Sequence, residues 1–104
     1  MDERPYKYEF SPLAEHDLYE IFDYIALEMY SPKAADHLID NVQSAVEKVC
    51  EFPFSRPLLT NKALQRKGYR LLVVENFNIF YLVKGKTVII QRVLYNKRNF
   101  ENIL

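Results

Sequence analysis

The residues best suited to chemistry in this sequence are basic, and they crowd into its second half. Residues 53–104 hold ten Lys or Arg against two Asp or Glu, a net charge of +8. Residues 1–52 hold four against twelve, a net charge of −8. Such asymmetry predicts an anionic partner for the basic half. The alternative is that the halves form opposite faces that attract each other within the fold, although exposed ion pairs add little stability.

A basic, proline-bearing loop over residues 53–67 concentrates part of this charge. Arg56 stands near its start, and Lys62, Arg66 and Lys67 form a cluster at its end. Such a loop either contacts phosphate or an acidic peptide, or is simply solvated.

Histidine and cysteine offer little for catalysis or metal binding here. His16 and His37 lie on separate expected helices without a carboxylate or cysteine at ligand spacing, so we expect surface histidines and no metal. Cys50 lacks the sequence signature of a nucleophile and is expected to be a small buried hydrophobe. Nothing in the sequence indicates a cofactor.

Length and composition bound the architecture that must position these residues. The chain has 104 residues, of which 49% are hydrophobic, which suits one small core and a single domain over residues 1–104. A lone cysteine, no leader and no apolar run of about 18 residues indicate a reducing compartment without membrane attachment. The expected location is the cytoplasm.

The first half predicts a strand followed by a helical hairpin. Residues 6–10 alternate apolar and polar side chains, as a strand does. Ser11-Pro12 and Ser31-Pro32 are typical helix starts, with serine as the N-cap. One apolar stripe follows each start, and the first helix should also show solvent an acidic face that includes Asp17. The stripes comprise Leu18, Ile21, Phe22, Ile25 and Met29, and then Ala35, Leu38, Ile39, Val42, Ala45, Val46 and Val49.

The second half predicts three strands joined by tight turns. Residues 69–74, 77–83 and 87–95 are rich in β-branched and aromatic side chains, and short turn sequences separate them. The predicted fold is therefore α+β with the order βααβββ, an antiparallel sheet packed on the N-terminal helical hairpin. The other face of the sheet should stay partly free, and residues 99–104 form either a short helix or a tail.

Several short motifs, taken in order, resemble the RelE/ParE superfamily of toxins from type II toxin–antitoxin systems. Their succession at the right spacing covers nearly the whole chain. The resemblance implies the same fold, a cognate antitoxin protein, and a target that is either DNA gyrase or the ribosome with its mRNA. The motifs are residues 13–18 with Ile21 and Tyr24-Ile25, 31–35, Glu51-Phe52-Pro53, Gly68-Tyr69-Arg70, Ile79-Phe80-Tyr81 and 92–98.

The RelE branch cleaves mRNA in the ribosome with basic and proton-transferring side chains gathered on the open sheet face. By position, Arg70 matches the first basic residue of that set, and Arg98 matches a later arginine. The chain departs from the set at three places, which leaves it without an evident base or acid. Leu72 replaces a lysine, Asn78 replaces an arginine, and Leu104 stands where a terminal tyrosine is expected.

Two tyrosines are candidates for reactive or base-binding groups of a nuclease. If the chain is a nuclease, Tyr95 could donate a proton and Tyr81 could stack on a base, beside Arg70 and Arg98. The alternative for both tyrosines is packing in the core or at its rim. Binding to the target or the antitoxin is expected from seven basic residues, namely Arg56, Arg66, Lys67, Arg70, Arg92, Lys97 and Arg98.

Two hypotheses from different classes follow from the resemblance. In the first, the chain is a ParE-like toxin that inhibits growth by binding gyrase and needs no catalytic residue. In the second, it is a RelE-like, ribosome-dependent mRNA endonuclease. The incomplete catalytic set, the long helical hairpin and the balanced overall charge favour the first. An inert relative that only binds the antitoxin is a third alternative.

Overall fold

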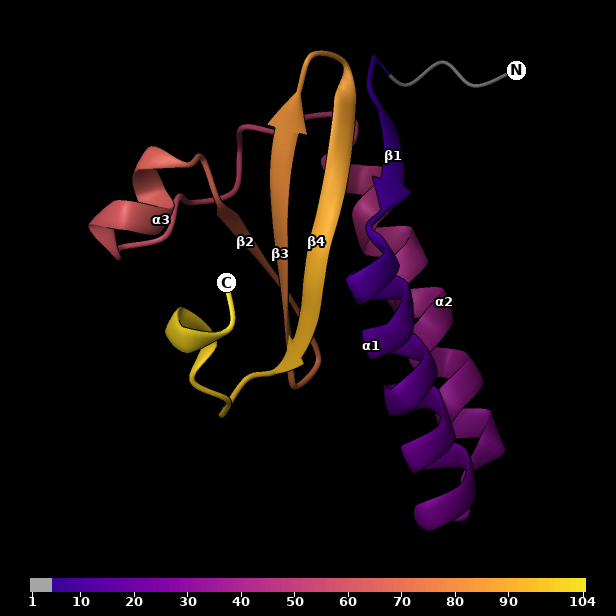
Figure 1. Ribbon diagram of the computed structural model, residues 1–104. Helices are drawn as coiled ribbons and strands as arrows, with labels where there is room; N and C mark the ends of the chain where they lie inside the picture. Colours follow the sequence, from indigo (N-terminus) through magenta and orange to yellow (C-terminus); the bar gives the residue numbers. More distant parts are fainter. Residues whose placement is uncertain (1–4) are drawn as a thin grey trace.

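The structure is a computed structural model that describes residues 5–104. Its elements follow the predicted order βααβββ, with three short helical segments added (Figure 1). In chain order they are β1 (Lys7–Phe10), α1 (Pro12–Asp23), the π-helix η1 (Tyr24–Glu28), α2 (Pro32–Val49), α3 (Lys62–Arg66), β2 (Arg70–Val74), β3 (Phe77–Lys84), β4 (Thr87–Tyr95) and the 3₁₀ turn η2 (Phe100–Asn102).

Both helices of the hairpin begin where the sequence predicts. Ser11 caps α1, since its side-chain oxygen accepts from the amide of Ala14, and Pro12 occupies the first turn. Ser31 is likewise the N-cap residue of α2, with Pro32 in the first turn, but its side chain makes no capping hydrogen bond. Between the helices the chain forms η1 and then Tyr30, which has a positive φ of 50°. The hairpin projects beyond the end of the sheet (Figure 1).

The four strands form one sheet in the order β1-β4-β3-β2. Tight turns make β2, β3 and β4 antiparallel, as predicted, whereas β1 pairs with β4 in parallel. The register slips once, because Phe80 pairs with Arg92 and Tyr81 with Ile90, which leaves Gln91 as the extra residue of a bulge. The α+β architecture expected from the sequence is therefore confirmed.

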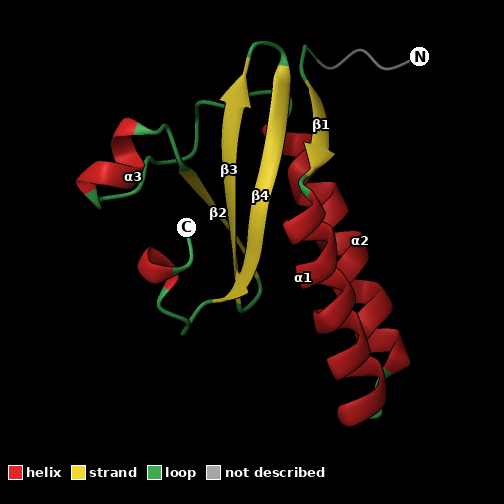
Figure 2. Ribbon diagram, viewed as in Figure 1, coloured by secondary structure: helices red, strands yellow, loops and turns green. Residues whose placement is uncertain are grey.

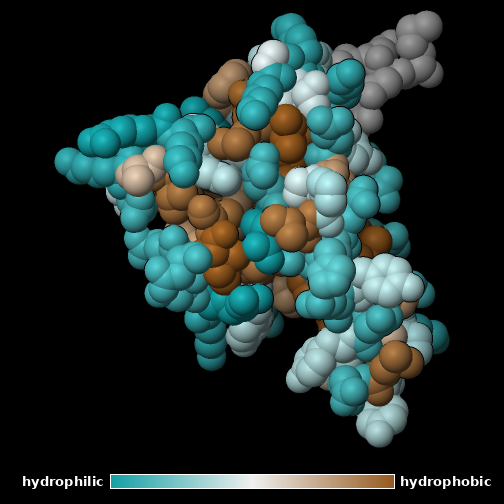
Figure 3. Space-filling view, in the orientation of Figure 1, coloured by the Kyte–Doolittle hydropathy of each residue, from teal (hydrophilic) through white to brown (hydrophobic). Residues whose placement is uncertain are grey.

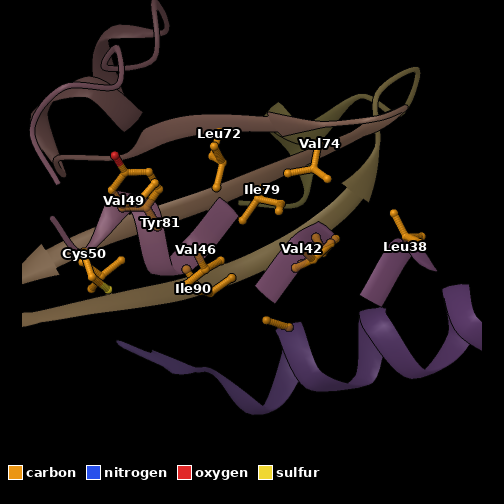
Figure 4. Close-up of a cluster of buried hydrophobic side chains, with 13 residues drawn as sticks. Leu38, Val42, Val46, Val49, Cys50, Leu72, Val74, Ile79, Tyr81 and Ile90 are labelled. Carbon is orange, nitrogen blue, oxygen red and sulfur yellow. The ribbon is translucent and has the colours of Figure 1, made fainter. Parts of the chain in front are cut away.

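One face of the sheet packs against α1 and α2 around a continuous apolar core (Figure 4). The α2 stripe supplies Leu38, Val42, Val46 and Val49 to it, as its spacing predicts. Cys50 is fully buried there, as expected. Met29 was expected in the stripe of the first helix but is 59% exposed, because the hairpin tip lies beyond the sheet that would cover it.

The opposite face stays partly free, as expected, and a second apolar cluster covers the rest of it. Phe80 and Leu94 of the sheet pack there with Leu59 and Leu64, and the C-terminal Leu104 joins them. Helix α3 interrupts the segment that the sequence predicts to be loop, and η2 turns the C-terminus back onto the sheet (Figure 2). Hydrophobic surface shows between α3 and the C-terminus (Figure 3).

Candidate functional site

An internal ion pair takes up one of the arginines expected to meet a partner. The guanidinium of Arg92 donates to both carboxylate oxygens of Asp17, over 2.7 Å from Nε and 2.8 Å from Nη2. Their side chains are 16% and 9% exposed. This hydrogen bonding raises the pKa of Arg92 above its ordinary value, although burial opposes the shift. Arg92 is thus a structural residue, because α1 brings a carboxylate to it.

Asp17 also corrects the expected acidic face of α1. It is 8% exposed, and its Oδ2 accepts a third bond, 3.0 Å long, from the amide of Val93. That amide lies on β4 beyond the end of β1, where the strand would otherwise present an unpaired edge. The sequence held a signal for this, because Ala14, Asp17 and Ile21 follow helical spacing and place Asp17 on the buried side.

Arg70 holds a loop in place instead of lying on an open sheet face. Its Nη1 donates to the carbonyl of Arg56 over 2.6 Å and to that of Phe54 over 3.3 Å. Its guanidinium carbon lies 5.2 Å from the centre of the Phe54 ring. Arg70 alternates with Leu71 along β2, and Leu72 is buried in the helix-side core. The resemblance therefore placed Arg70 on the wrong face.

Tyr81 is a core residue in this structure. It is fully buried, and its hydroxyl donates to the carbonyl of Pro53 over 2.7 Å. Burial raises its pKa to about 12, although the positive charges of Arg70 and Arg56 lower it. Its side chain leaves no ring face on which a base could stack. A phenol with so high a pKa is also a weak proton donor at neutral pH.

A groove brings together the remaining candidates, Tyr95 and Arg98. It measures about 810 Å³ and lies between the hairpin and the end of the sheet where β4 finishes. Tyr95 is 43% exposed, and its ring packs edge-on against Phe77 with centroids 6.0 Å apart. The groove is lined by Asp17, Glu20, Ile21, Tyr24, Ile25, Met29, Ala34, Glu75, Asn76, Phe77, Val93, Leu94, Tyr95 and Arg98.

Reasoning from the sequence names no residue on the hairpin side of this groove. Ile21 and Ile25 are partly buried on its floor, whereas Tyr24 and Met29 stay 60% and 59% exposed. Large apolar side chains in solvent at a concave surface are typical of a protein-binding site. The sequence contained a signal for this exposed surface, because the apolar stripe of the first helix continues to Met29, farther than a short sheet can cover. The space-filling view shows hydrophobic and near-neutral residues at this projecting end (Figure 3).

The other expected binding residues do not converge on one site. Arg56 precedes β2, whereas Arg66 and Lys67 end α3, and Lys97 and Arg98 follow β4; all five are exposed. Helix α3 is tied to the C-terminal turn by Asn61, whose amide donates to Glu101 over 2.6 Å. The expected cations therefore occupy separate places around the sheet.

No metal site is built from the part of the chain that the structure describes, where no three His, Cys, Asp or Glu side chains gather as ligands. His16 is exposed and lies 3.4 Å from Glu20, one helical turn away. Across residues 5–104, no helix combines the length and the apolar character needed to cross a membrane.

Comparison with known proteins identifies the family to which this chain belongs. The family described as the ParE toxin of type II toxin–antitoxin systems, parDE, matches residues 8–100. A solved structure titled "Chromosomal ParDE TA system from P. aeruginosa" is similar with a TM-score of 0.68 and 23% sequence identity, over 89% of this chain and 98% of that one. Among curated proteins, none is similar enough to match. The chain belongs to the ParE toxin family and is the toxin component of a type II toxin–antitoxin system.

Proposed function

We propose that this toxin inhibits growth by binding DNA gyrase and not by cleaving RNA. The observation that carries the proposal is the state of the residues a nuclease would use. Arg70 is hydrogen-bonded to two main-chain carbonyls, and Tyr81 is fully buried. Losing a general acid or base typically slows a reaction by roughly 10²- to 10⁴-fold.

The second apolar cluster on the other face of the sheet supports the same conclusion. Phe80 is fully buried on that face and stacks on Phe100 with ring centroids 4.9 Å apart. Leu104 packs in the same cluster, where the RelE pattern has a proton-transferring tyrosine. RNA cleavage on this face would require polar side chains where apolar ones pack.

Two assays on the purified toxin test the choice of target. Gyrase supercoiling of relaxed plasmid should be inhibited, and translated mRNA on programmed ribosomes should stay intact. Cells in which the toxin is induced should filament and mount a DNA-damage response. Cleavage of translated mRNA at defined codon positions would overturn the proposal. Tyr95 and Arg98, which share the groove, would then be the first residues to substitute.

We also infer that the groove is where the antitoxin holds the toxin. Its apolar floor suits the apolar side of an amphipathic segment, and Arg98 in its lining, with Lys97 next to it in the sequence, suits an acidic residue of that segment. The remaining basic residues of the second half would extend this contact.

Co-purification with the protein of the neighbouring small open reading frame tests the groove. Met29→Glu should weaken the complex, because a charge would enter an apolar contact. Leu27→Glu is the matched control, since Leu27 is 67% exposed and does not line the groove. Equal co-purification of the two variants would place the antitoxin elsewhere.

A further inference from the structure

The end of the sheet opposite the hairpin tip combines cations with exposed aromatic rings. We name it the cationic end and define it by Tyr6-Lys7, Phe52–Arg56, Arg70 and Lys84–Lys86. It includes the turn between β3 and β4 at the top of Figure 1, and it has no part in the groove.

Direct contacts make these segments one continuous surface. The ammonium of Lys86 lies 4.9 Å from the centre of the Tyr6 ring, and that ring meets Phe54 edge-on at 6.3 Å. Arg70 lies over the other ring of the pair, Phe54, at 5.2 Å. The amide of Lys7 donates to the carbonyl of Lys86 over 3.0 Å, which joins the first strand to the turn.

The charge on this surface is of one sign. Its segments carry Lys7, Arg56, Arg70, Lys84 and Lys86 and contain no carboxylate, although Glu9 and Glu51 flank them. Within residues 5–104, none of these five cations forms an ion pair with a carboxylate. Arg70 and Arg56 also bear on the buried Tyr81, whose pKa they lower against the effect of burial. An anion is the complementary ligand.

The exposed rings of Phe52 and Phe54 indicate which class of anion binds the cationic end. Phe52 and Phe54 are 70% and 58% exposed and lie two residues apart on one loop, so they offer ring surface to a ligand. The loop that carries them is rigidly held, because Tyr81 binds the carbonyl of Pro53 and Arg70 binds those of Phe54 and Arg56. A fixed aromatic platform beside cations is the arrangement that stacks unpaired bases and neutralises phosphates.

We propose that the cationic end binds single-stranded nucleic acid, with a base stacked on Phe52 and phosphates on Lys84, Lys86 and Arg56. An acidic peptide would satisfy the cations but would leave the rings uncovered. A duplex keeps its bases stacked on one another and offers none to the platform. This binding is independent of the proposed function, since it requires neither gyrase nor a catalytic residue.

Fluorescence anisotropy with a labelled, mixed-sequence DNA single strand of about 12 nucleotides tests the proposal. The full-length toxin, free of antitoxin and without gyrase, should bind the strand, and its affinity should fall linearly on a logarithmic salt scale. Lys84→Gln should reduce that slope by about 0.7, the value for one phosphate contact to a single strand. Lys33→Gln makes the same charge change at the exposed start of α2 and should leave the slope unchanged.

The aromatic platform has its own matched pair of variants. Phe52→Ala should weaken binding roughly 5- to 150-fold with little change in salt slope, because it removes a base stack and not a charge. Tyr19→Ala is the control, since Tyr19 is 71% exposed on α1, outside the cationic end. Circular dichroism should show that both variants fold, as expected for exposed side chains.

Four results would overturn the proposal. These are no binding at low salt, equal losses in the test and control variants, equally tight binding of a duplex of the same length, and binding of an acidic peptide but not of the strand. The last result would assign the cationic end to an acidic protein segment.

Discussion

The two ends of this molecule each fix an arginine, but they do so in different ways. At the groove, Arg92 meets a carboxylate, Asp17, and the pair is nearly excluded from water. At the cationic end, Arg70 meets only main-chain carbonyls and a ring in a more exposed position. The first arrangement cancels a charge to hold a helix against a strand. The second keeps the charge while it shapes a loop, so it stays available to attract anions.

The difference predicts where substitutions destabilise the fold and where they change binding only. A buried ion pair that loses one member leaves the other charge without a partner in a poorly solvated place. An exposed cation that is removed takes little stability with it. Changes near Asp17 should therefore act through folding, whereas changes at exposed cations should act through partners.

Asp17→Asn should have the largest effect. It leaves Arg92 buried without its countercharge, and it weakens the bond to the amide of Val93. We expect a loss of about 3 kcal/mol in the free energy of unfolding, at the low end for buried pairs because Arg92 keeps some exposure. Urea unfolding measures it. Glu15→Gln, an exposed change on the same helix, is the control and should stay within about 0.5 kcal/mol.

The double variant Asp17→Asn with Arg92→Met sharpens this prediction. Removing both charges should recover part of the stability lost in the single variant, because no unpaired charge remains. Strictly additive losses would show that the two side chains do not act as a pair.

Tyr81→Phe should have the next largest effect, because the Tyr81 hydroxyl holds the loop of the cationic end at Pro53. The buried carbonyl of Pro53 would lose its donor, which costs roughly 1–2 kcal/mol of unfolding free energy. Tyr95→Phe changes an exposed hydroxyl and should cost less than about 0.5 kcal/mol. Similar losses in both variants would contradict the structural role of Tyr81.

The same tyrosine predicts a pH dependence. Its pKa rises from 10.0 to about 12 on folding, so above pH 10 the unfolded chain releases a proton that the folded protein retains. The stability that Tyr81 contributes is therefore complete below pH 10 and is lost between pH 10 and about 12. The wild type should lose its advantage over Tyr81→Phe across this range in urea titrations. A constant difference would count against the raised pKa.

Arg70→Ala should have a smaller effect on stability, of about 1 kcal/mol, because its bonds to the carbonyls of Phe54 and Arg56 are exposed to solvent. The sequence alone predicts that Arg70 and Arg98 can be replaced together without cost to the fold. The structure revises this for Arg70, which anchors a loop. Arg66→Ala, an exposed change on α3, is the control for urea unfolding. If Arg70→Ala lowers the free energy of unfolding no more than Arg66→Ala does, Arg70 does not anchor the loop.

Arg98→Ala should have the smallest effect on folding and a clear effect on toxicity. Arg98 is exposed at the groove, so its loss should change stability by no more than about 0.5 kcal/mol. Growth after induction should recover if this cation meets the target. Full toxicity in the folded variant would show that Arg98 does not contact the target.

The sequence by itself determined the strands, the two long helices and their order. Apolar periodicity and turn residues are local signals, and they held for α2, β3 and β4 to within a few residues. Charge asymmetry and the motif order were also enough for the toxin family. The apolar stripe of the first helix failed at Met29, which lies where the hairpin leaves the sheet and no element covers it. Ser31 marks the start of α2 as predicted but makes no side-chain cap.

Only the tertiary structure decided which charged residues remain free for partners. Asp17 and Arg92 are 75 residues apart, and they meet because α1 runs along β4 beyond the end of β1. The bulge at Gln91 shifts the register of β4 by one residue, and each residue of shift sends a side chain to the other face. Such pairings depend on strand order, register and element length together, and no local pattern of residue types records them.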